Sequence, residues 1–362
     1  MGGTVPSDPP RKVCTDNRMP ITANYYVTLR CNQRCVFCNI PHTNNGSPSR
    51  EPTMDQVRSN LRDLKKLGVI VLDITGGEPL LYRNLVEMLD YATKLRFFTT
   101  VTTNGMLYPK FADQLVGKVK ALLFSIDSTD PDEHDRIRAM KSFHQVIEAL
   151  AVARKLKQTL YISHVVTNES FDKVDEMVRF AKDQGAILYL NPCFSFFGNE
   201  GLDPEKAAAL EKYFGQPGVI LDPAQLALIA SGGNKTTDPV CRAVSSSVVI
   251  SPENELWLPC YHFRQQGIPI DNDLYDLYTR GPVVQEAKRM EGRHHFCEGC
   301  TVYCYMRSSL QWKYPVKSVT MAGVYFRERI RQKIRYMVDP PNPAPIPEGS
   351  TRRHLPLAGP GE

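Results

Sequence analysis

Short apolar runs alternate with longer amphipathic stretches from about residue 21 to residue 200. The runs rich in β-branched and aromatic residues predict six strands, at 23–29, 68–75, 97–103, 121–127, 160–166 and 186–192. Between them, apolar residues recur at helical spacing, for example over 54–68 and 142–157. This α/β alternation predicts a parallel sheet. Six units suffice for a partial (β/α)6 TIM-type barrel, whose functional residues are expected at the carboxyl ends of the strands.

The rhythm is lost after residue 200. Residues 201–240 read as a linker with one helix, at 204–214, followed by a stretch punctuated by Gly, Pro and Ser. Residues 248–260 read as a β-hairpin whose turn is formed by Pro252, Glu253 and Asn254. The pattern therefore divides the chain into a flexible N-terminus (1–20), a barrel (21–200), the linker, a small hairpin and helix domain (241–338) and a Pro-rich, disordered tail (339–362).

The last helical stretch, 324–338, has an apolar stripe and a basic surface. Phe326, Ile330, Ile334 and Met337 fall on one stripe, and four basic residues lie elsewhere on the helix. One interpretation is a helix that docks by its apolar stripe and exposes a solvated basic face. The other is a surface that attracts an anionic substrate or acidic lipid headgroups.

The composition indicates a globular protein without a membrane-spanning segment. The 362 residues are 42% hydrophobic and 23% charged, which is typical of a globular protein. The apolar runs are strand-sized and shorter than the roughly 20 residues that span a bilayer, and the N-terminus does not resemble a secretory signal. We therefore expect a cytoplasmic protein, in which ten cysteines suit metal ligation better than disulfides. A net charge of +5 is slight, and no aromatic residues interleave with a basic stripe, so we expect no nucleic-acid partner.

Three cysteines stand close together in the stretch "CNQRCVFC". Cys31, Cys35 and Cys38 have the spacing C-x3-C-x2-C. Thiolates at this spacing suit zinc or an iron–sulfur cluster. A structural zinc site needs four closed ligands, and this stretch supplies three. Three ligands on a four-iron cluster would leave one iron open, which metal catalysis requires.

The same region resembles a known family. "CNQRCVFC", followed in order by "ITGGEPLL", "TVTTNG" and "FSIDSTDPDEHDRIR", resembles the radical S-adenosylmethionine (SAM) enzymes over roughly residues 21–200. The resemblance implies that Cys31, Cys35 and Cys38 hold a [4Fe–4S] cluster that chelates SAM. It also implies reductive cleavage of SAM to a 5'-deoxyadenosyl radical, which abstracts hydrogen from a substrate. An external electron donor, such as flavodoxin or ferredoxin, would supply the electron.

Several residues at predicted strand ends are candidates for SAM binding. Gly76 and Gly77 let the backbone approach a ligand closely, and Glu78 with Pro79 offers acceptors for an ammonium group. By resemblance, Phe37 lies against the adenine. Ser125 and Asp127 are placed for the ribose, and Arg138, or its neighbour Arg136, for the SAM carboxylate. The remaining candidates at strand ends are Thr103, Asn104 and Asn168.

A second cysteine group follows the barrel. Cys241, Cys260, Cys297, Cys300 and Cys304 have the spacing C-x18-C-x36-C-x2-C-x3-C. This arrangement resembles the SPASM and twitch extensions of radical SAM enzymes, which bind auxiliary [4Fe–4S] clusters. It departs from SPASM because Glu255 stands where that pattern has Gly, and because five cysteines are too few for two full clusters. One cysteine is then surplus, Cys304 or another of the five, and a structural zinc site stays open as an alternative.

These features predict a radical SAM enzyme with one auxiliary cluster that aids oxidation or bond formation. The substrate would be a small molecule, a lipid precursor or a peptide, including anionic ones, and peripheral membrane contact is compatible with the basic helix. The alternatives are a redox-neutral radical SAM epimerase or rearrangement enzyme with a structural C-terminal metal site, and a non-catalytic two-cluster electron carrier. Cys193, at the end of the sixth predicted strand, is either a buried apolar residue or a donor of hydrogen to a substrate radical.

Overall fold

The computed structural model describes residues 19–40, 50–195 and 200–338. The proposed flexible N-terminus, apart from its last two residues, and the proposed Pro-rich tail lie outside these ranges. All six predicted strands form, and together with four more they make one sheet in the order β10-β9-β8-β1-β2-β3-β4-β5-β6-β7. The strands are β1 Thr22–Thr28, β2 Val71–Gly76, β3 Phe98–Thr103, β4 Ala121–Ser125, β5 Leu160–Val166, β6 Ile187–Pro192, β7 Val219–Ile220, β8 Ser247–Ile250, β9 Glu255–Leu258 and β10 Gln266–Pro269.

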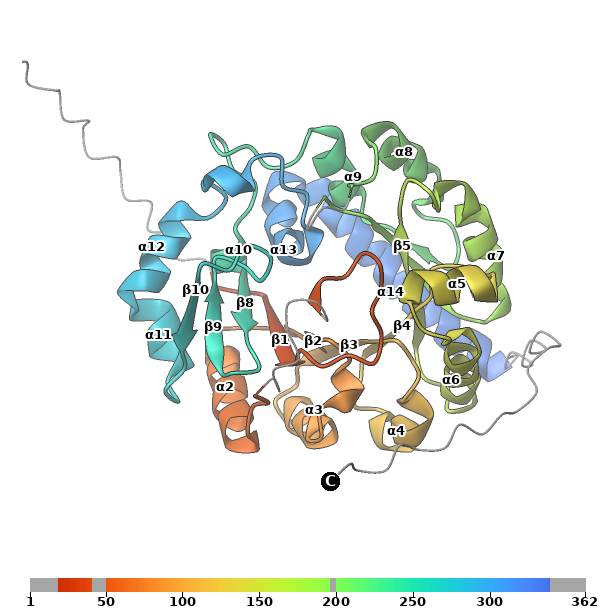
Figure 1. Ribbon diagram of the computed structural model, residues 1–362, viewed down its shortest axis with the longest axis horizontal. Helices are drawn as coiled ribbons and strands as arrows, with labels where there is room; N and C mark the ends of the chain where they lie inside the picture. The colour runs from red at the N-terminus through yellow and green to blue at the C-terminus, as the bar shows by residue number, and fades with distance from the viewer. Residues whose placement is uncertain (1–18, 41–49, 196–199, 339–362) are drawn as a thin grey trace, which may run out of the picture.

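Strands β1 to β7 are parallel and curve around a central space, and helices cover their outer face (Figure 1). This is the partial TIM-type barrel that the sequence predicts. The helices associated with it are α2 Met54–Lys66, α3 Leu85–Lys94, α4 Tyr108–Leu115, α5 Pro131–Arg138, α6 Phe143–Lys155, α7 Val174–Asp183, α8 Pro204–Ala209 and α9 Pro223–Ala230. Local signals start them, as in the capping box that Thr53 and Gln56 form at α2.

The C-terminal region continues the barrel sheet. Strand β8 pairs in parallel with β1, and β8 and β9 form the predicted antiparallel hairpin. The helices of this region are α10 Ala243–Ser246, α11 Leu274–Arg280, α12 Pro282–Met290, α13 Tyr303–Lys313 and α14 Pro315–Val338. Helix α13 contacts α9, α10 and α14, so it lies between the β7 and β8 sides of the barrel. The second cysteine group is thereby built against the first strand of the barrel.

The two faces of the barrel strands have different surroundings. In β2 and β3, buried residues alternate with residues that solvent partly reaches, and the buried Leu72, Ile74 and Val101 join the main hydrophobic core. The second set faces the barrel axis, and it includes Asp73, Thr75, Thr100 and Thr102. The interior of the barrel, which we call the lumen, is therefore polar and accessible to solvent at these positions.

Helix α14 contradicts the docking interpretation of its apolar stripe. Phe326, Ile330, Ile334 and Met337 are exposed. The helix docks instead by Val324, Glu328, Gln332 and Tyr336, spaced four residues apart on the opposite side. The docked face is decided by hydrogen bonds between polar side chains of α14 and backbone groups of the barrel. The Gln332 side chain bonds to N and O of Leu160 and to O of Gly185, and Glu328 accepts from N of Gly218 at 2.8 Å. These backbone groups lie before or at the start of β5, β6 and β7, so α14 covers the amino ends of the strands.

Within the described ranges, no helix is both long enough and apolar enough to cross a membrane.

Candidate functional site

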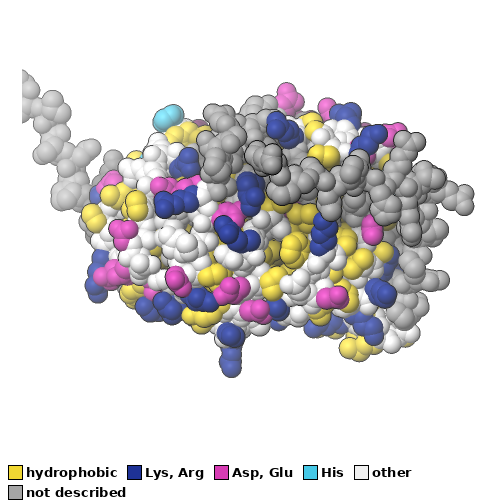
Figure 2. Space-filling model, turned by 60° about the horizontal axis from the view of Figure 1, so that its bottom comes forward, with side chains coloured by type: hydrophobic (Ala, Val, Ile, Leu, Met, Phe, Trp, Pro, Cys, Tyr) yellow, Lys and Arg dark blue, Asp and Glu magenta, His cyan; other side chains and the backbone are white. Residues whose placement is uncertain are grey.

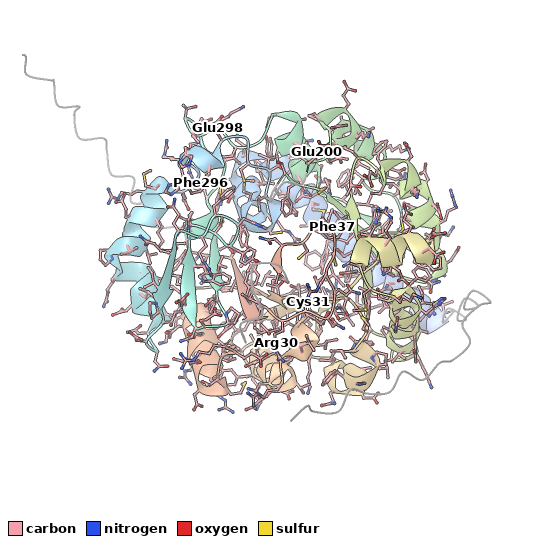
Figure 3. All side chains as sticks on the ribbon, in the orientation of Figure 1. Arg30, Cys31, Phe37, Glu200, Phe296 and Glu298 are labelled. Carbon is pink, nitrogen blue, oxygen red and sulfur yellow. The ribbon has the colours of Figure 1, made fainter. Side chains whose placement is uncertain are left out.

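The three-cysteine loop leaves β1 at the carboxyl end of the barrel strands, where Cys31 and Phe37 lie inside the ring of strands (Figure 3). Cys35 is buried, and Cys31 and Cys38 are half-buried. The loop is fixed from two sides. Arg34 N and Val36 N donate to O of Arg138 and of Ile137, which end α5. Gly77 N donates to Thr28 O, and Glu78 N donates to Arg30 O, each at 2.8 Å.

The two glycines of the GGEP motif make this second contact possible. A Cβ on Gly76 would lie 2.1 Å from Thr28 O, and a Cβ on Gly77 would lie 2.1 Å from Arg30 O. Both neighbours are backbone atoms that cannot move aside cheaply. The glycines therefore seat the start of the cysteine loop, a role in addition to the ligand approach expected from the sequence.

Glu78 is buried and holds two other candidate residues, Thr103 and Asn104. Its carboxylate accepts from Thr103 Oγ1 at 2.8 Å, from Asn104 N at 2.8 Å and from Leu80 N at 3.0 Å. Burial raises the pKa of Glu78, and these bonds oppose the rise. Asn104 in turn donates to Asn32 Oδ1 in the cysteine loop at 2.6 Å. Pro79 begins a short 3-10 helix and is buried. The motif thus connects the ends of β2 and β3 to the loop.

Arg138 reaches the loop from α5. Its Nη2 pairs with Asp127 Oδ2 at 2.5 Å, its Nη1 lies 3.6 Å from Cys35 Sγ, and its guanidinium lies 5.6 Å from the Phe37 ring centre. The neighbouring Arg136 is exposed, so Arg138 is the arginine that the fold directs inward. Its Nε is buried and has no hydrogen-bond partner among the described residues. A ligand that offers an oxygen, such as a carboxylate, would satisfy this donor.

The other strand-end candidates have varied positions. Ser125 ends β4, paired with Ser163 of β5. Asp127 also accepts from Val165 N at 3.2 Å. Asn168 holds a different segment, since its amide donates to Gly201 O and to Asp203 Oδ1. Cys193 is buried beside Phe194 O, and burial raises the pKa of its thiol.

Four of the five C-terminal cysteines lie close together, and the fifth, Cys304, lies apart from them. Cys241, Cys260, Cys297 and Cys300 are close enough for their charges to interact, and burial raises the pKa of each thiol, to about 12 for Cys260 and about 11 for Cys297. The charges that act on Cys304 are those of Asp73 in β2 and of Arg307. Cys304 therefore faces the barrel lumen, while the other four group together.

Asn234, which the sequence pattern did not single out, bonds to the backbone of three of these four cysteines, Cys241, Cys297 and Cys300. Its Oδ1 accepts from Val240 N and Cys241 N at 2.9 and 3.0 Å, and its Nδ2 donates to Gly292 O and Cys297 O at 2.8 and 3.0 Å. Asn234 N also donates to Cys300 O at 2.9 Å. One buried amide thus connects three segments that carry cysteines. The only hint in the sequence is the preceding Gly-Gly pair, which marks a turn.

Aromatic side chains fill the space between the two cysteine groups. Tyr26 of β1 stacks on Tyr261, which follows Cys260, with ring centres 4.7 Å apart. Tyr26 also shares a short hydrogen bond with Tyr305, next to Cys304, and packs against Trp257 of β9. One largely aromatic cluster is therefore contacted by Leu29 and Ile40, which flank the three-cysteine loop, and by three later cysteines, Cys241, Cys260 and Cys300.

The lumen below the three-cysteine loop has charged walls. Asp73 accepts a short hydrogen bond from Thr100 Oγ1. Arg307 of α13 is exposed to solvent, and it forms no hydrogen bond or ion pair with the residues that the structure describes. Tyr189, Tyr303 and Asp222 act on it electrostatically and raise its pKa. Solvent reaches Cys304, yet burial raises its pKa to about 11. A side chain that lines an enclosed space is both reached by solvent and surrounded by protein, as Cys304 is.

A single metal ion and a four-iron cluster need different distances between their thiolate ligands. Among the described residues, no three His, Cys, Asp or Glu side chains lie close enough together to hold a single metal ion. A four-iron cluster is itself several ångströms across and holds its thiolates further apart. Burial raises the pKa of Cys31, Cys38 and the four grouped C-terminal thiols, so loading a metal on these thiols would release protons.

Comparisons with known proteins agree with this geometry. The sequence model of the Radical SAM superfamily matches residues 25–181. The chain is 28% identical to the AdoMet-dependent heme synthase of Methanosarcina barkeri over 166 residues, covering 45% of this chain and 47% of that protein. It is 26% identical over 293 residues to AlbA, the antilisterial bacteriocin subtilosin biosynthesis protein of Bacillus subtilis, covering 78% of this chain and 64% of AlbA. The chain spans about half the length of the first of these relatives.

Solved structures share the fold. Streptococcus suis SuiB bound to S-adenosylmethionine superposes with a TM-score of 0.63 at 19% identity, over 78% of this chain and 71% of SuiB. The protein anSMEcpe with bound AdoMet gives a TM-score of 0.58 at 16% identity, over 87% of this chain and 96% of that one. The chain therefore carries a region, residues 25–181, that matches the Radical SAM superfamily, within a fold that it shares with SuiB and anSMEcpe.

Proposed function

We propose that the protein is a radical SAM enzyme with two [4Fe–4S] clusters. Cys31, Cys35 and Cys38 would hold the cluster that binds SAM. Cys241, Cys260, Cys297 and Cys300 would hold an auxiliary cluster of the SPASM or twitch type. When bound, the reduced first cluster supplies the electron that cleaves SAM and yields the 5'-deoxyadenosyl radical.

The observation that carries this proposal is the sorting of the cysteines. One loop presents three thiols at the carboxyl end of the barrel strands, and four of the five later cysteines group together, three of them bonded to Asn234 through their backbone. Three thiols suit a cluster with an open iron, and four suit a closed one. Cys304, pointing into the lumen, would then be a residue of the substrate cavity.

The chain's own residues would orient SAM and exclude water. Arg138 has a buried, unpartnered Nε beside the loop and is suited to the SAM carboxylate. Phe37, under the same guanidinium, offers an apolar face for the adenine. Glu78 would act mainly by holding Thr103 and Asn104 in place, because protein donors occupy both of its oxygens. Ser125 and Asp127 would lie near the ribose.

The substrate would enter the lumen. SuiB has been solved with its precursor peptide SuiA, and AlbA serves bacteriocin biosynthesis. By analogy we propose a peptide or a small polar molecule as the substrate. Arg307, Asp73 and Cys304 would face it, since solvent reaches all three and they come from both sides of the lumen. The charge of Arg307 suits an anionic group on the substrate, and that of Asp73 suits a cationic one.

Iron and acid-labile sulfide per chain, after anaerobic reconstitution, test the cluster assignment. A variant with Cys31, Cys35 and Cys38 changed to Ala should keep about four irons and four sulfides. Changing Cys241, Cys260, Cys297 and Cys300 to Ala should also leave about four. The matched control is Cys304→Ala, which should keep all eight. Zinc without sulfide in the variant that lacks Cys31, Cys35 and Cys38 would refute the auxiliary cluster. Loss of iron in Cys304→Ala would show that Cys304 is a cluster ligand.

Cleavage of SAM tests the activity. The reduced wild-type protein should release 5'-deoxyadenosine from SAM, and the variant that lacks the first three cysteines should release none. A fully reconstituted and reduced protein that leaves SAM intact, with candidate peptides present, would favour a non-catalytic electron carrier.

A further inference from the structure

The exposed stripe of α14 is unusual for a helix that docks on a barrel. Its exposed apolar residues have side chains 54–79% accessible to solvent. They are Val316, Val319, Phe326, Ile330, Ile334, Met337 and Val338. At 100° per residue these side chains fall on one side of the helix, opposite the Glu328 and Gln332 row that contacts the barrel. A helix of this length extends about 36 Å, so the stripe is long as well as exposed.

The charged side chains on both edges of the stripe are basic. Arg327 and Arg331 flank it on one side, where both also pair with Glu328, and Arg329 and Lys333 flank it on the other. Glu328, the one acidic residue of α14, is fully buried on the docked side. The exposed half of α14 therefore combines an apolar stripe with basic edges, which is the pattern of helices that lie in a membrane interface.

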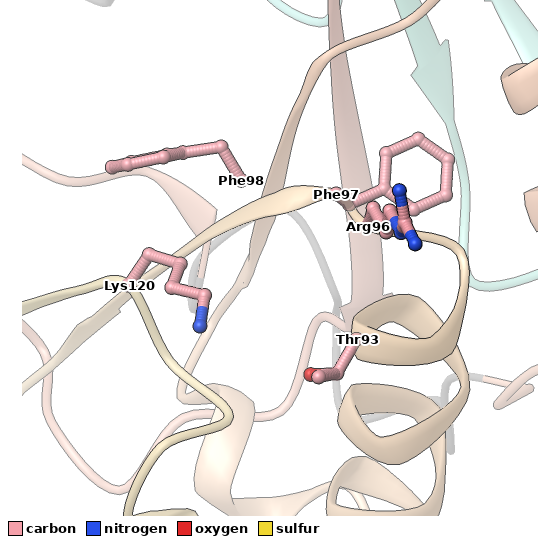
Figure 4. Close-up of a pocket in the computed structure, with 5 residues that line it drawn as sticks. All are labelled: Thr93, Arg96, Phe97, Phe98 and Lys120. Atoms are coloured by element: carbon pink, nitrogen blue, oxygen red, sulfur yellow. The ribbon is translucent and has the colours of Figure 1, made fainter.

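Two pockets beside α14 extend the basic surface. One, of about 160 Å³, includes Lys120, Lys157, Arg329 and Lys333 in its lining. The other, of about 320 Å³, is lined by Thr93, Arg96, Phe97, Phe98 and Lys120 (Figure 4). In the part of the chain that the structure describes, no acidic residue lines either pocket. Each therefore offers cations to an anionic group the size of a phosphate.

The surroundings of the pockets contain few negative charges. Lys118 pairs with Asp90 at 2.8 Å, and Lys317 at the start of α14 lies 3.8 Å from Glu211. The basic residues that line the pockets have no such acidic partner among the described residues. Figure 2 shows Lys and Arg side chains along the lower edge of the face it presents, with hydrophobic and some Asp and Glu side chains between and above them.

We propose that this face, the stripe of α14 with its basic edges and the two pockets, binds the protein to an anionic lipid surface. The apolar residues would enter the headgroup region, and the basic residues would contact lipid phosphates. Because α14 covers the amino ends of the strands, the three-cysteine loop at their carboxyl ends would face away from the membrane. The inference is independent of the proposed activity.

Charge favours lipid over a second copy of the chain. Two α14 helices packed stripe to stripe would bring their arginine and lysine edges together, and like charges at such an interface cost free energy. A surface of anionic lipids attracts the same edges. The occupant that fits both the stripe and its edges is therefore a membrane with acidic headgroups.

Cosedimentation of the full-length protein with vesicles tests this inference. We expect binding to phosphatidylcholine vesicles that contain about a third phosphatidylglycerol, weaker binding at higher salt, and little binding to phosphatidylcholine alone. The double variant Phe326→Ser with Ile330→Ser should bind roughly tenfold or more weakly, and Lys157→Glu with Lys333→Glu should do the same.

Matched controls lie on other faces. Val283→Ser with Met290→Ser changes exposed apolar residues of α12, and Lys110→Glu reverses an exposed charge on α4. Both should bind as wild type, and thermal unfolding checks that every variant is folded. Absence of binding to the anionic vesicles, equal binding by the α14 variants, or a wild-type dimer that Phe326→Ser with Ile330→Ser dissociates would each overturn the proposal.

Discussion

Asn234→Ala should loosen the connection between the segments that carry Cys241 and Cys297. The side chain makes four hydrogen bonds in a fully buried position, two as acceptor and two as donor. Alanine leaves two backbone N–H groups and two carbonyls without these partners. A buried polar group that loses its partner costs about 1–3 kcal/mol. The bond to Gly292 O is fully buried and the other three are partly buried, so we expect a loss of about 1–3 kcal/mol in the free energy of unfolding.

Two measurements check this prediction. Urea unfolding of the apoprotein gives the change in stability without a contribution from lost iron. Iron analysis in the variant that lacks Cys31, Cys35 and Cys38 should then show less than half of the auxiliary iron. Asn168→Ala is the matched control, because its bonds to Gly201 and Asp203 are partly exposed and water can replace them. Its cost should stay below about 1 kcal/mol. A similar small cost for Asn234→Ala, with full iron content, would refute the reasoning.

Three further predictions concern the first site. Gly77→Ala should abolish iron binding by the three-cysteine loop, because its Cβ would lie 2.1 Å from a backbone oxygen, whereas Gly323→Ala, in open space, should leave iron content unchanged. Arg138→Lys should weaken SAM binding roughly tenfold in equilibrium dialysis, because lysine lacks the forked donors, while exposed Arg136→Lys should not. Burial lowers the pKa of His134 to about 4 from 6.5, so the unfolded state binds more protons between these values and acidification destabilises the fold by up to about 1.4 kcal/mol per pH unit. His134→Gln should therefore lose less stability than wild type in urea unfolding between pH 6.5 and 4.5, and an equal slope would contradict the assignment.

The sequence by itself determined the elements of the barrel and the position of its first site. Period-two and period-3.6 patterns arise from burial on one face of a strand or helix, so they are visible locally. The spacing of Cys31, Cys35 and Cys38 is local as well, and the GGEP and following motifs lie at strand ends that a parallel sheet must bring to one edge. The hairpin at 248–260 was also predicted, because its turn residues are contiguous in the chain.

Only the tertiary structure decided which face of α14 docks and where each late cysteine points. Periodicity shows that α14 has an apolar stripe, but Gln332 and Glu328 satisfy backbone groups at the starts of strands that lie more than a hundred residues earlier in the chain. Cys300 and Cys304 are one helical turn apart in sequence, yet one joins the Asn234 group and the other faces Asp73 across the lumen. Such partners are set by how distant segments meet, because hydrogen bonds and charges act over ångströms of space and not over positions in the chain.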